Sequence, residues 1–371
     1  MKRLLRYLAI LVIALVALAG ILFAFGARIV LDGGGRLHVR FIESSSEREQ
    51  AVERHRESQR ATAPIVPAAA PGQSGAGPVA PGTAAMPVPA EPAAVAAAFD
   101  WIDYRGPNRD GHYRGRILTT WPSSGLRSLW KQPVGEGYAS FVVAGGRAFT
   151  IEQRGEREVV AAYDVASGRE LWANSWTAAF REFMGGDGPR ATPVWADGLV
   201  YALGGEGELR CLDDATGRVV WRTNILADAG ASNLQWGMAA SPLIVDNTVV
   251  ALPGGSGGKS VVAYDRRTGA RAWSALDDQS AYASPMLVTL AGVRQILVFG
   301  ATRLMGLSPT DGAFLWEYPW RTQYDMNAAQ PLVIGENRVF LSSGYGTGAA
   351  VVEITGPARR LRSVKSGATS G

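Results

Sequence analysis

The chain has 371 residues, is 47% apolar, contains 45 glycines and 11 tryptophans, and carries a formal net charge of +4. This length and composition are sufficient to bury one large β core with many tight turns. The positive charge does not indicate nucleic-acid binding, because the last seventeen residues alone carry +4, through Arg359, Arg360, Arg362 and Lys365, and the remainder sums to zero.

The first 28 residues predict a cytoplasmic tip and a transmembrane anchor. Three basic residues precede eighteen uncharged residues, Leu8 to Phe25, which are enough to span a bilayer. A cleaved signal peptide is the alternative, with an A-x-A site at Ala17-Leu18-Ala19, but apolar residues continue beyond that site. Because the positive residues stay in the cytoplasm, we expect a single-pass inner-membrane protein whose folded part lies in the periplasm.

Two segments without a core of their own follow the anchor. Residues 29–61 are expected to be a polar juxtamembrane segment, in which 44–60 form a short solvated helix or no structure. Residues 62–98 contain eight prolines among alanines and glycines, so we expect a disordered, semi-extended linker. The folded domain is therefore predicted at 99–355.

An eleven-residue phrase returns four times and defines a repeat. The copies are AYDVASGRELW (Ala162 to Trp172), CLDDATGRVVW (Cys211 to Trp221), AYDRRTGARAW (Ala263 to Trp273) and GLSPTDGAFLW (Gly306 to Trp316). Their tryptophans are 49, 52 and 43 residues apart, the size of a four-stranded propeller blade. In each copy Asp or Ser starts a turn, glycine closes it, and a strand runs on to the tryptophan. We expect five tryptophans to act as staples between blades and to donate their N–H groups to carbonyls: Trp130, Trp172, Trp221, Trp273 and Trp316.

A second phrase, of small residues, precedes each tryptophan by 28 to 31 residues. Its copies are Ala139-Ser140-Phe141, Ala191-Thr192-Pro193, Ala240-Ser241-Pro242, Ala283-Ser284-Pro285 and Ala329-Gln330-Pro331. Small residues suit the innermost strand of a blade, where the blades converge on a narrow axis. One blade is therefore predicted to run from this phrase to its tryptophan.

The AxDxxTGxxxW phrase resembles that of the PQQ-like β-propeller repeat proteins, over about Trp101 to Ile354. This superfamily includes quinoprotein alcohol dehydrogenases and the BamB-type lipoprotein of outer-membrane assembly. The segment WIDYRGPNRDG (Trp101 to Gly111) resembles that of membrane-anchored members more narrowly. Within it, we expect Tyr104-Arg105-Gly106-Pro107 and Asp110 to seal the underside of the ring. The resemblance implies an all-β, PQQ-like β-propeller of four-stranded blades, about five of them present, with the ring incomplete.

The last blade is predicted to be unfinished. It begins well with GENRVFLSSGYG (Gly335 to Gly346), but Arg360 stands where the tryptophan is expected. Residues 356–371 are therefore expected to be a disordered or frameshifted tail of a truncated protein. The alternative is a five-bladed ring closed by Trp130, with Ser128 to Lys131 as a lone outer strand.

No catalytic residue and no metal site is predicted. The three histidines, His38, His55 and His112, lie outside the blades, which argues against a histidine-based triad or metal site. The resemblance to quinoprotein dehydrogenases implies pyrroloquinoline quinone (PQQ) with Ca²⁺. Oxygens for Ca²⁺ are available from Asp187, Asp325 and Asn327, without a spacing that sets them apart from ordinary loop residues. We therefore expect no cofactor, with PQQ and Ca²⁺ as the alternative.

The residues next to the small phrase are expected to line one mouth of the propeller channel and to bind a ligand. They are Tyr138, Arg190, Trp236, Tyr282 and Gln330. Aromatic faces and one guanidinium suit an anionic or planar ligand or a peptide, unless Arg190 pairs with Asp187 and the tyrosines cap loops. The sequence thus favours a scaffold that binds a periplasmic protein or small ligand, without catalysis. The alternatives are a truncated PQQ-dependent dehydrogenase and a fragment that does not fold.

Overall fold

The computed structural model describes residues 2–24, 26–31, 37–41, 45–62, 100–115, 117, 119–355 and 361–364. The chain divides into two compact units between Ala61 and Thr62. The predicted linker at 62–98 lies outside the described residues, except for Thr62, which ends a helix.

The described residues of the first unit form two helices and a hairpin. Helix α1 (Lys2–Ala24) is followed by β1 (Ala27–Leu31), which pairs antiparallel with β2 (Leu37–Phe41), and by α2 (Ser45–Thr62). Helix α2 corresponds to the short solvated helix that was one of the two expectations for residues 44–60. The hairpin was not predicted. Within the described part of the chain, no helix combines the length and apolarity that a membrane crossing requires, which leaves the predicted anchor unconfirmed.

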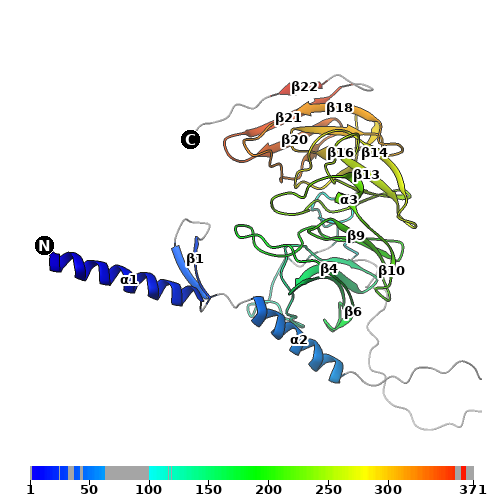
Figure 1. Cartoon of the computed structure of the whole chain (residues 1–371). Helices are drawn as coiled ribbons and strands as arrows, with labels where there is room; N and C mark the ends of the chain where they lie inside the picture. The colour runs from blue at the N-terminus through cyan, green and yellow to red at the C-terminus, as the bar shows by residue number, and fades with distance from the viewer. Residues whose placement is uncertain are drawn as a thin grey trace, which may run out of the picture. The chain divides into compact units, whose positions relative to one another are not determined.

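The second unit is all-β apart from the short helix α3 (Ile225–Ala229), and its described residues form five antiparallel sheets of four strands, arranged in chain order (Figure 1). The first three sheets are β3 (Val142–Ala144), β4 (Arg147–Arg154), β5 (Arg157–Asp164), β6 (Glu170–Thr177); β7 (Val194–Ala196), β8 (Leu199–Leu203), β9 (Glu208–Asp213), β10 (Val219–Asn224); and β11 (Leu243–Val245), β12 (Thr248–Ala251), β13 (Val261–Asp265), β14 (Arg271–Ala275). The last two are β15 (Met286–Leu290), β16 (Val293–Phe299), β17 (Arg303–Leu307), β18 (Phe314–Pro319); and β19 (Leu332–Ile334), β20 (Arg338–Ser343), β21 (Gly348–Ile354), β22 (Leu361–Val364). The prediction of four-stranded blades is confirmed. The small phrases were expected to lie in the innermost strands, whereas each phrase ends just before its strand begins.

The predicted tail contains a strand. Strand β22 pairs with β21 through Leu361 opposite Ile354, so residues 361–364 occupy the fourth place of the last sheet. The prediction of disorder is wrong for these four residues, because the backbone continues the sheet although Arg360 replaces the expected tryptophan. Residues 356–360 and 365–371 lie outside the described part. The expected lone outer strand at Ser128 to Lys131 is not formed.

The small phrases join the innermost strands of neighbouring sheets. The amide of Ser140 donates to Thr192 Oγ1 at 3.0 Å, and the amide of Thr192 donates to Ser241 Oγ at 3.0 Å. The amide of Ser241 then donates to Ser284 Oγ at 2.9 Å. The sequence indicated only that these residues must be small. Their hydroxyl groups also accept hydrogen bonds from backbone amides of the preceding blade, two of which are buried.

Each of four tryptophans packs on the glycine of the following repeat. The pairs, with the distance from the ring to an ideal Cβ placed on the glycine, are Trp130 on Gly168 (2.5 Å), Trp172 on Gly217 (2.5 Å), Trp221 on Gly269 (2.8 Å) and Trp273 on Gly312 (2.5 Å). These glycines have φ between +69° and +75°. Both the turn and the approach of the indole therefore require glycine.

The indole N–H groups do not all find a backbone carbonyl. Those of Trp130, Trp172 and Trp221 donate to the carbonyls of Val165, Asp214 and Arg266 at 2.8, 2.9 and 2.9 Å. Trp316 donates instead to Gln295 Oε1 of its own sheet at 2.5 Å, and the N–H of Trp273 is buried without a partner among the described residues. The expected carbonyl is present at three of the five positions.

Replacement of Gly217 by alanine is expected to lower the free energy of unfolding by about 1–3 kcal/mol, because the new methyl group overlaps the Trp172 ring. Gly198→Ala is a matched control, since Gly198 has φ +80° and nothing lies within 4 Å of an ideal Cβ placed on it. The control retains the cost of a positive φ and lacks the overlap. Urea denaturation of both variants measures the difference. Equal losses of unfolding free energy would contradict a stabilising contact between the Trp172 ring and Gly217.

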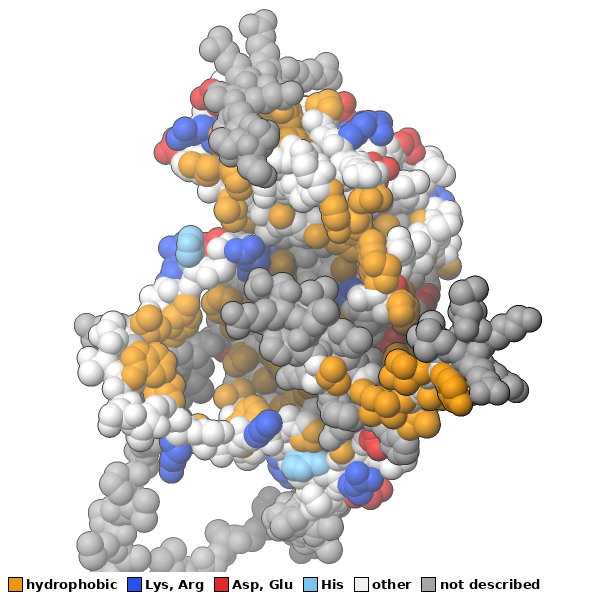
Figure 2. Space-filling view, turned by 90° about the vertical axis from the view of Figure 1, so that its left-hand side faces the viewer, with side chains coloured by type: hydrophobic (Ala, Val, Ile, Leu, Met, Phe, Trp, Pro, Cys, Tyr) orange, Lys and Arg blue, Asp and Glu red, His pale blue; other side chains and the backbone are white. Residues whose placement is uncertain are grey.

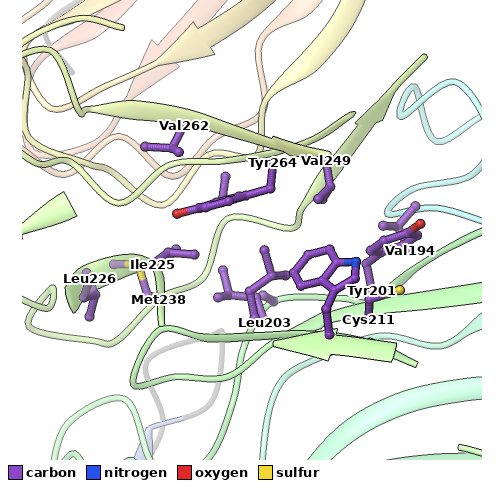
Figure 3. Close-up of a cluster of buried hydrophobic side chains, with 14 residues drawn as sticks. Val194, Tyr201, Leu203, Cys211, Ile225, Leu226, Met238, Val249, Val262 and Tyr264 are labelled. Atoms are coloured by element: carbon purple, nitrogen blue, oxygen red, sulfur yellow. The ribbon is translucent and has the colours of Figure 1, made fainter. Parts of the chain in front are cut away.

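Hydrophobic cores lie between neighbouring sheets. In Figure 3, Tyr264 and Val249 of the third sheet face Leu203 and Tyr201 of the second. Cys211 belongs to the same cluster and is fully buried. Each interface is therefore an apolar layer shared by two blades.

The segment of residues 100–111 crosses the innermost strands. Trp101 pairs with Val143 of β3 through two backbone hydrogen bonds of 2.8 and 2.9 Å. The carbonyl of Ile102 accepts the amide of Trp195 of β7 at 2.8 Å. Further along the segment, Arg109 is 2% exposed. It was not singled out in the sequence.

Arg109 binds one carboxylate and three backbone carbonyls. Its Nε and Nη2 atoms donate to the two carboxylate oxygens of Asp103 at 2.9 and 2.7 Å. The guanidinium also donates to the carbonyls of Pro285 (2.7 Å), Ser241 (3.3 Å) and Pro242. The crossing segment therefore connects the first two sheets to the starts of the third and fourth.

Candidate functional site

Two sets of loops gather at one end of the sheets, which we call the loop face. Residues 178–193, 225–242, 276–285 and 320–331 connect the last strand of one sheet to the first strand of the next. The hairpin loops at 204–207, 252–260, 300–302 and 344–347 lie at the same end, because alternate connections of an antiparallel sheet share one edge. Hydrophobic side chains are exposed in groups on the surface that Figure 2 presents.

Arg190 is held between two aromatic rings. Its guanidinium lies 5.1 Å from the ring centre of Tyr138 and 5.0 Å from that of Phe180. Its N–H groups donate to the carbonyls of Gly188 and Gly186, both at 2.9 Å. This arrangement combines cation–π contacts with hydrogen bonds to the loop itself.

Asp187 does not pair with Arg190, which was the alternative considered from the sequence. Its carboxylate contacts Arg181 at 3.2 Å and accepts the amide of Glu182 at 3.1 Å. Glu182 in turn accepts the amides of Gly185 and Met184, and these hydrogen bonds lower the pKa of its carboxyl. The glycine-rich loop is thus closed by its own side chains.

Trp236 and Tyr282 form a second aromatic pair. Their ring centres are 5.8 Å apart at an interplanar angle of 59°. The amide of Trp236 donates to the Tyr282 hydroxyl at 3.5 Å, and burial raises the pKa of that phenol. The pair joins the loops 225–242 and 276–285.

Gln330 makes a contact between blades rather than facing the cleft described below. Its Nε2 donates to the carbonyl of Ser284 at 2.8 Å. It occupies the position that Thr192, Ser241 and Ser284 occupy in the earlier small phrases. Its side chain therefore links the fourth and fifth sheets.

An aromatic cleft with two adjoining halves lies on the loop face. The tyrosine half has a volume of about 590 Å³ and the arginine half about 480 Å³, and they share Trp236, Tyr282, Met326 and Tyr345. The tyrosine half adds Met184, Asn233, Leu234, Gln235, Gln279, Ser280, Tyr324 and Asp325; the arginine half adds Arg190, Ala239, Ala328, Ala329, Ser342, Ser343 and Gly344. Of the predicted residues, Arg190, Trp236 and Tyr282 line this cleft, and Tyr138 contacts Arg190.

Sequence reasoning missed Tyr324 and Tyr345. They form an edge-to-face pair with ring centres 5.2 Å apart and an interplanar angle of 84°. Tyr324 lies in a connection between sheets and Tyr345 in a hairpin loop, so their distance along the chain hid the pair. The sequence signal that could have indicated this pair is that both tyrosines lie in loops at the same end of the predicted blades.

Two of the three residues considered for Ca²⁺, Asn327 and Asp187, bond to other residues of the chain. Asn327 is fully buried, and its amide donates to the carbonyls of Gly300 and Ala301 while its oxygen accepts from Ser343 at 2.7 Å. Asp187 is engaged with Arg181 and Glu182, as described above. Among the described residues, no group of three or more His, Cys, Asp or Glu side chains is placed to hold a metal.

Glu158 is a buried carboxyl outside the cleft. It is 0% exposed, and its Oε1 accepts the amide of Gly205 at 2.7 Å. Burial raises the pKa of Glu158 to about 7, against the lowering effect of that hydrogen bond, and the nearby Glu206 raises it further. This carboxyl therefore changes charge near neutral pH.

Five four-stranded antiparallel sheets in chain order, stapled by tryptophans, define a β-propeller of the PQQ-like class. The family model described as "Outer membrane protein assembly factor BamB" matches residues 156–370, and the chain belongs to this family. The match includes residues that were predicted to be frameshifted.

Known proteins with a similar sequence or structure include two BamB proteins and an alcohol dehydrogenase. The outer membrane protein assembly factor BamB of Bordetella pertussis is 25% identical over 214 residues, which cover 56% of this chain and 49% of that protein. The chain thus spans about half the length of this curated relative. Similar solved structures are BamB from Moraxella catarrhalis (19% identity, TM-score 0.41, 61% of this chain and 60% of that one) and a quinohemoprotein alcohol dehydrogenase from Comamonas testosteroni (17%, 0.44, 62% and 43%).

Proposed function

We propose that this chain is a non-catalytic scaffold of outer-membrane protein assembly, located in the periplasm, which holds a partner protein at the aromatic cleft. Membership of the BamB family supports the process and the location. The cleft supports protein binding. Attachment to a membrane through residues 1–28 stays a prediction of the sequence.

The observation that carries the proposal is the exposure of large apolar side chains around the cleft. Phe183 is 96% exposed, Met184 75% and Tyr345 70%. Tyr138 and Tyr324, at 64% and 56%, extend the same loop face. Apolar side chains exposed in a group mark interaction surfaces, and aromatic residues and methionine are enriched in protein interfaces.

The alternative is a PQQ-dependent dehydrogenase. No contact among the described residues favours it. Asp187 and Asn327, two of the three residues considered for Ca²⁺, bond to other residues. Arg190 is committed to two carbonyls and two rings. A scaffold needs no such donor set, so we retain the binding function.

Cysteine-directed cross-linking tests the proposal in intact bacterial cells. Phe183→Cys supplies an exposed thiol, whereas the native Cys211 is buried and its pKa is raised to about 12, which suppresses thiolate chemistry. A benzophenone maleimide that cannot cross the inner membrane is expected to label Phe183→Cys. Irradiation is then expected to join the chain to an identified component of outer-membrane protein assembly.

Phe314→Cys is the matched control. Phe314 is also an exposed phenylalanine, 44% accessible, but it lies at the start of β18, at the end of the sheet opposite the loop face. It should be labelled without giving the same cross-linked product. Absence of labelling at both positions would contradict the periplasmic location. Labelling without a cross-link at Phe183, or equal cross-links at both, would contradict the binding surface.

A further inference from the structure

The tyrosine half of the cleft is walled by two aromatic pairs. Trp236 and Tyr282 form one pair, and Tyr324 and Tyr345 form the other. Both pairs line the same volume of about 590 Å³. Four rings thus border a space large enough for a long side chain.

Asp325 is the charged residue among the described lining of this half. It is exposed, has φ +52°, and also lines a neighbouring pocket of about 440 Å³. That pocket is lined by three carboxylates and one guanidinium, those of Asp277, Asp278, Asp325 and Arg321. The aromatic walls therefore open onto a region with excess negative charge.

The other carboxylates of the region have partners of their own. Asp278 accepts from the Thr302 hydroxyl at 3.0 Å and lies 3.7 Å from Arg303, while Asp277 accepts the amide of Gly258 at 3.0 Å. Asp325 is thus the carboxylate shared by the aromatic half and the acidic pocket.

From these contacts we propose that the tyrosine half takes a positively charged side chain, arginine or lysine, from an extended segment of the partner polypeptide. The cation lies against the aromatic faces, with Asp325 as its counter-charge. This inference rests on the proposed protein-binding function. The loop face already holds one guanidinium in this way, since Arg190 packs on Tyr138 and Phe180 at 5.1 and 5.0 Å.

Methyl NMR of the full chain tests the inference, because Met184 and Met326 line this half and the chain contains only seven methionines. The methyl signals are assigned with Met184→Leu and Met326→Leu. The probe is the peptide acetyl-Gly-Ser-Arg-Ser-Gly-amide, compared with the same peptide carrying citrulline or norleucine in place of arginine. We expect the arginine peptide to shift both methyl signals and to bind about three- to tenfold more tightly than the citrulline peptide. Added salt should weaken the arginine peptide selectively.

Variants locate the counter-charge. Asp325→Asn keeps the shape of the side chain and should weaken the arginine peptide about three- to tenfold while leaving the norleucine peptide unchanged. Asp246→Asn is the matched control, since Asp246 also has a positive φ, +51°, but lies in the hairpin between β11 and β12, away from the loop face. It should bind like the unaltered chain.

The two proposals fail in different ways. Equal shifts with arginine and citrulline, no shift with any peptide, or unchanged affinity in Asp325→Asn would overturn the cation site. If the cross-link at Phe183 persists in those cases, the scaffold function stands and only its ligand chemistry is wrong. If instead Phe183→Cys forms no cross-link although the residues that line the cleft are unchanged, the scaffold function itself is wrong.

Discussion

Replacement of Arg109 by leucine is expected to lower the free energy of unfolding by about 3–5 kcal/mol. The change leaves the carboxylate of Asp103 buried without its cation and removes the donors of three carbonyls, those of Ser241, Pro242 and Pro285. Urea denaturation followed by tryptophan fluorescence measures the loss.

Arg114→Leu is the control for loss of an arginine in the same part of the chain. Its side chain is 79% exposed and lies 3.9 Å from Asp110, so we expect a loss of less than about 1 kcal/mol. Joint replacement of Asp103 and Arg109 by leucine should recover part of the stability, because no unpaired charge remains buried. A single Arg109→Leu variant as stable as the control would refute the bracing role of this residue.

Replacement of Glu158 by glutamine is expected to stabilise the protein by about 3 kcal/mol at pH 8 and to have little effect below pH 4.5. The pKa of Glu158 is raised from 4.5 to about 7 in the folded state, so the folded protein binds more protons than the unfolded chain between these values. The free energy of unfolding contributed by this group therefore falls as the pH rises through that window. Glutamine is neutral throughout and can still accept the amide of Gly205.

The measurement is the difference between the unfolding free energies of the two proteins from pH 4 to 8. Several aspartates with lowered pKa titrate below this window, and taking the difference cancels their contributions. A flat difference curve for Glu158→Gln would show that burial does not raise the pKa of this carboxyl.

The blades could be predicted because their signals are local. Asp213 and Gly217 act within a single turn, and Trp221 follows in the next strand, so their spacing is visible along the chain. The role of the small phrase was only partly visible, since the residue that accepts the amide of Ser140 is Thr192, in another blade.

The bracing residue and the complete cleft could not be predicted for the opposite reason. Arg109 contacts Ser241 and Pro285, more than a hundred residues away, and nothing in its own segment indicates this. The Tyr324–Tyr345 pair depends on how two loops are brought together by separate sheets. The tail was misjudged because Arg360 breaks the side-chain pattern, whereas a strand at the sheet edge is formed by backbone hydrogen bonds.

The crossing segment has a consequence for how the unit opens. The amide–hydroxyl hydrogen bonds and the tryptophan–glycine contacts connect each blade only to its neighbour. An array built from such contacts can separate at one interface while the remainder stays folded. Residues 100–111 act across several interfaces at once, from Val143 in the first blade to Pro285 at the start of the fourth. If two of these blades separate, residues 100–111 must also lose their contacts with the other blades. A sequence of independent steps thereby becomes a single cooperative transition over the first four blades.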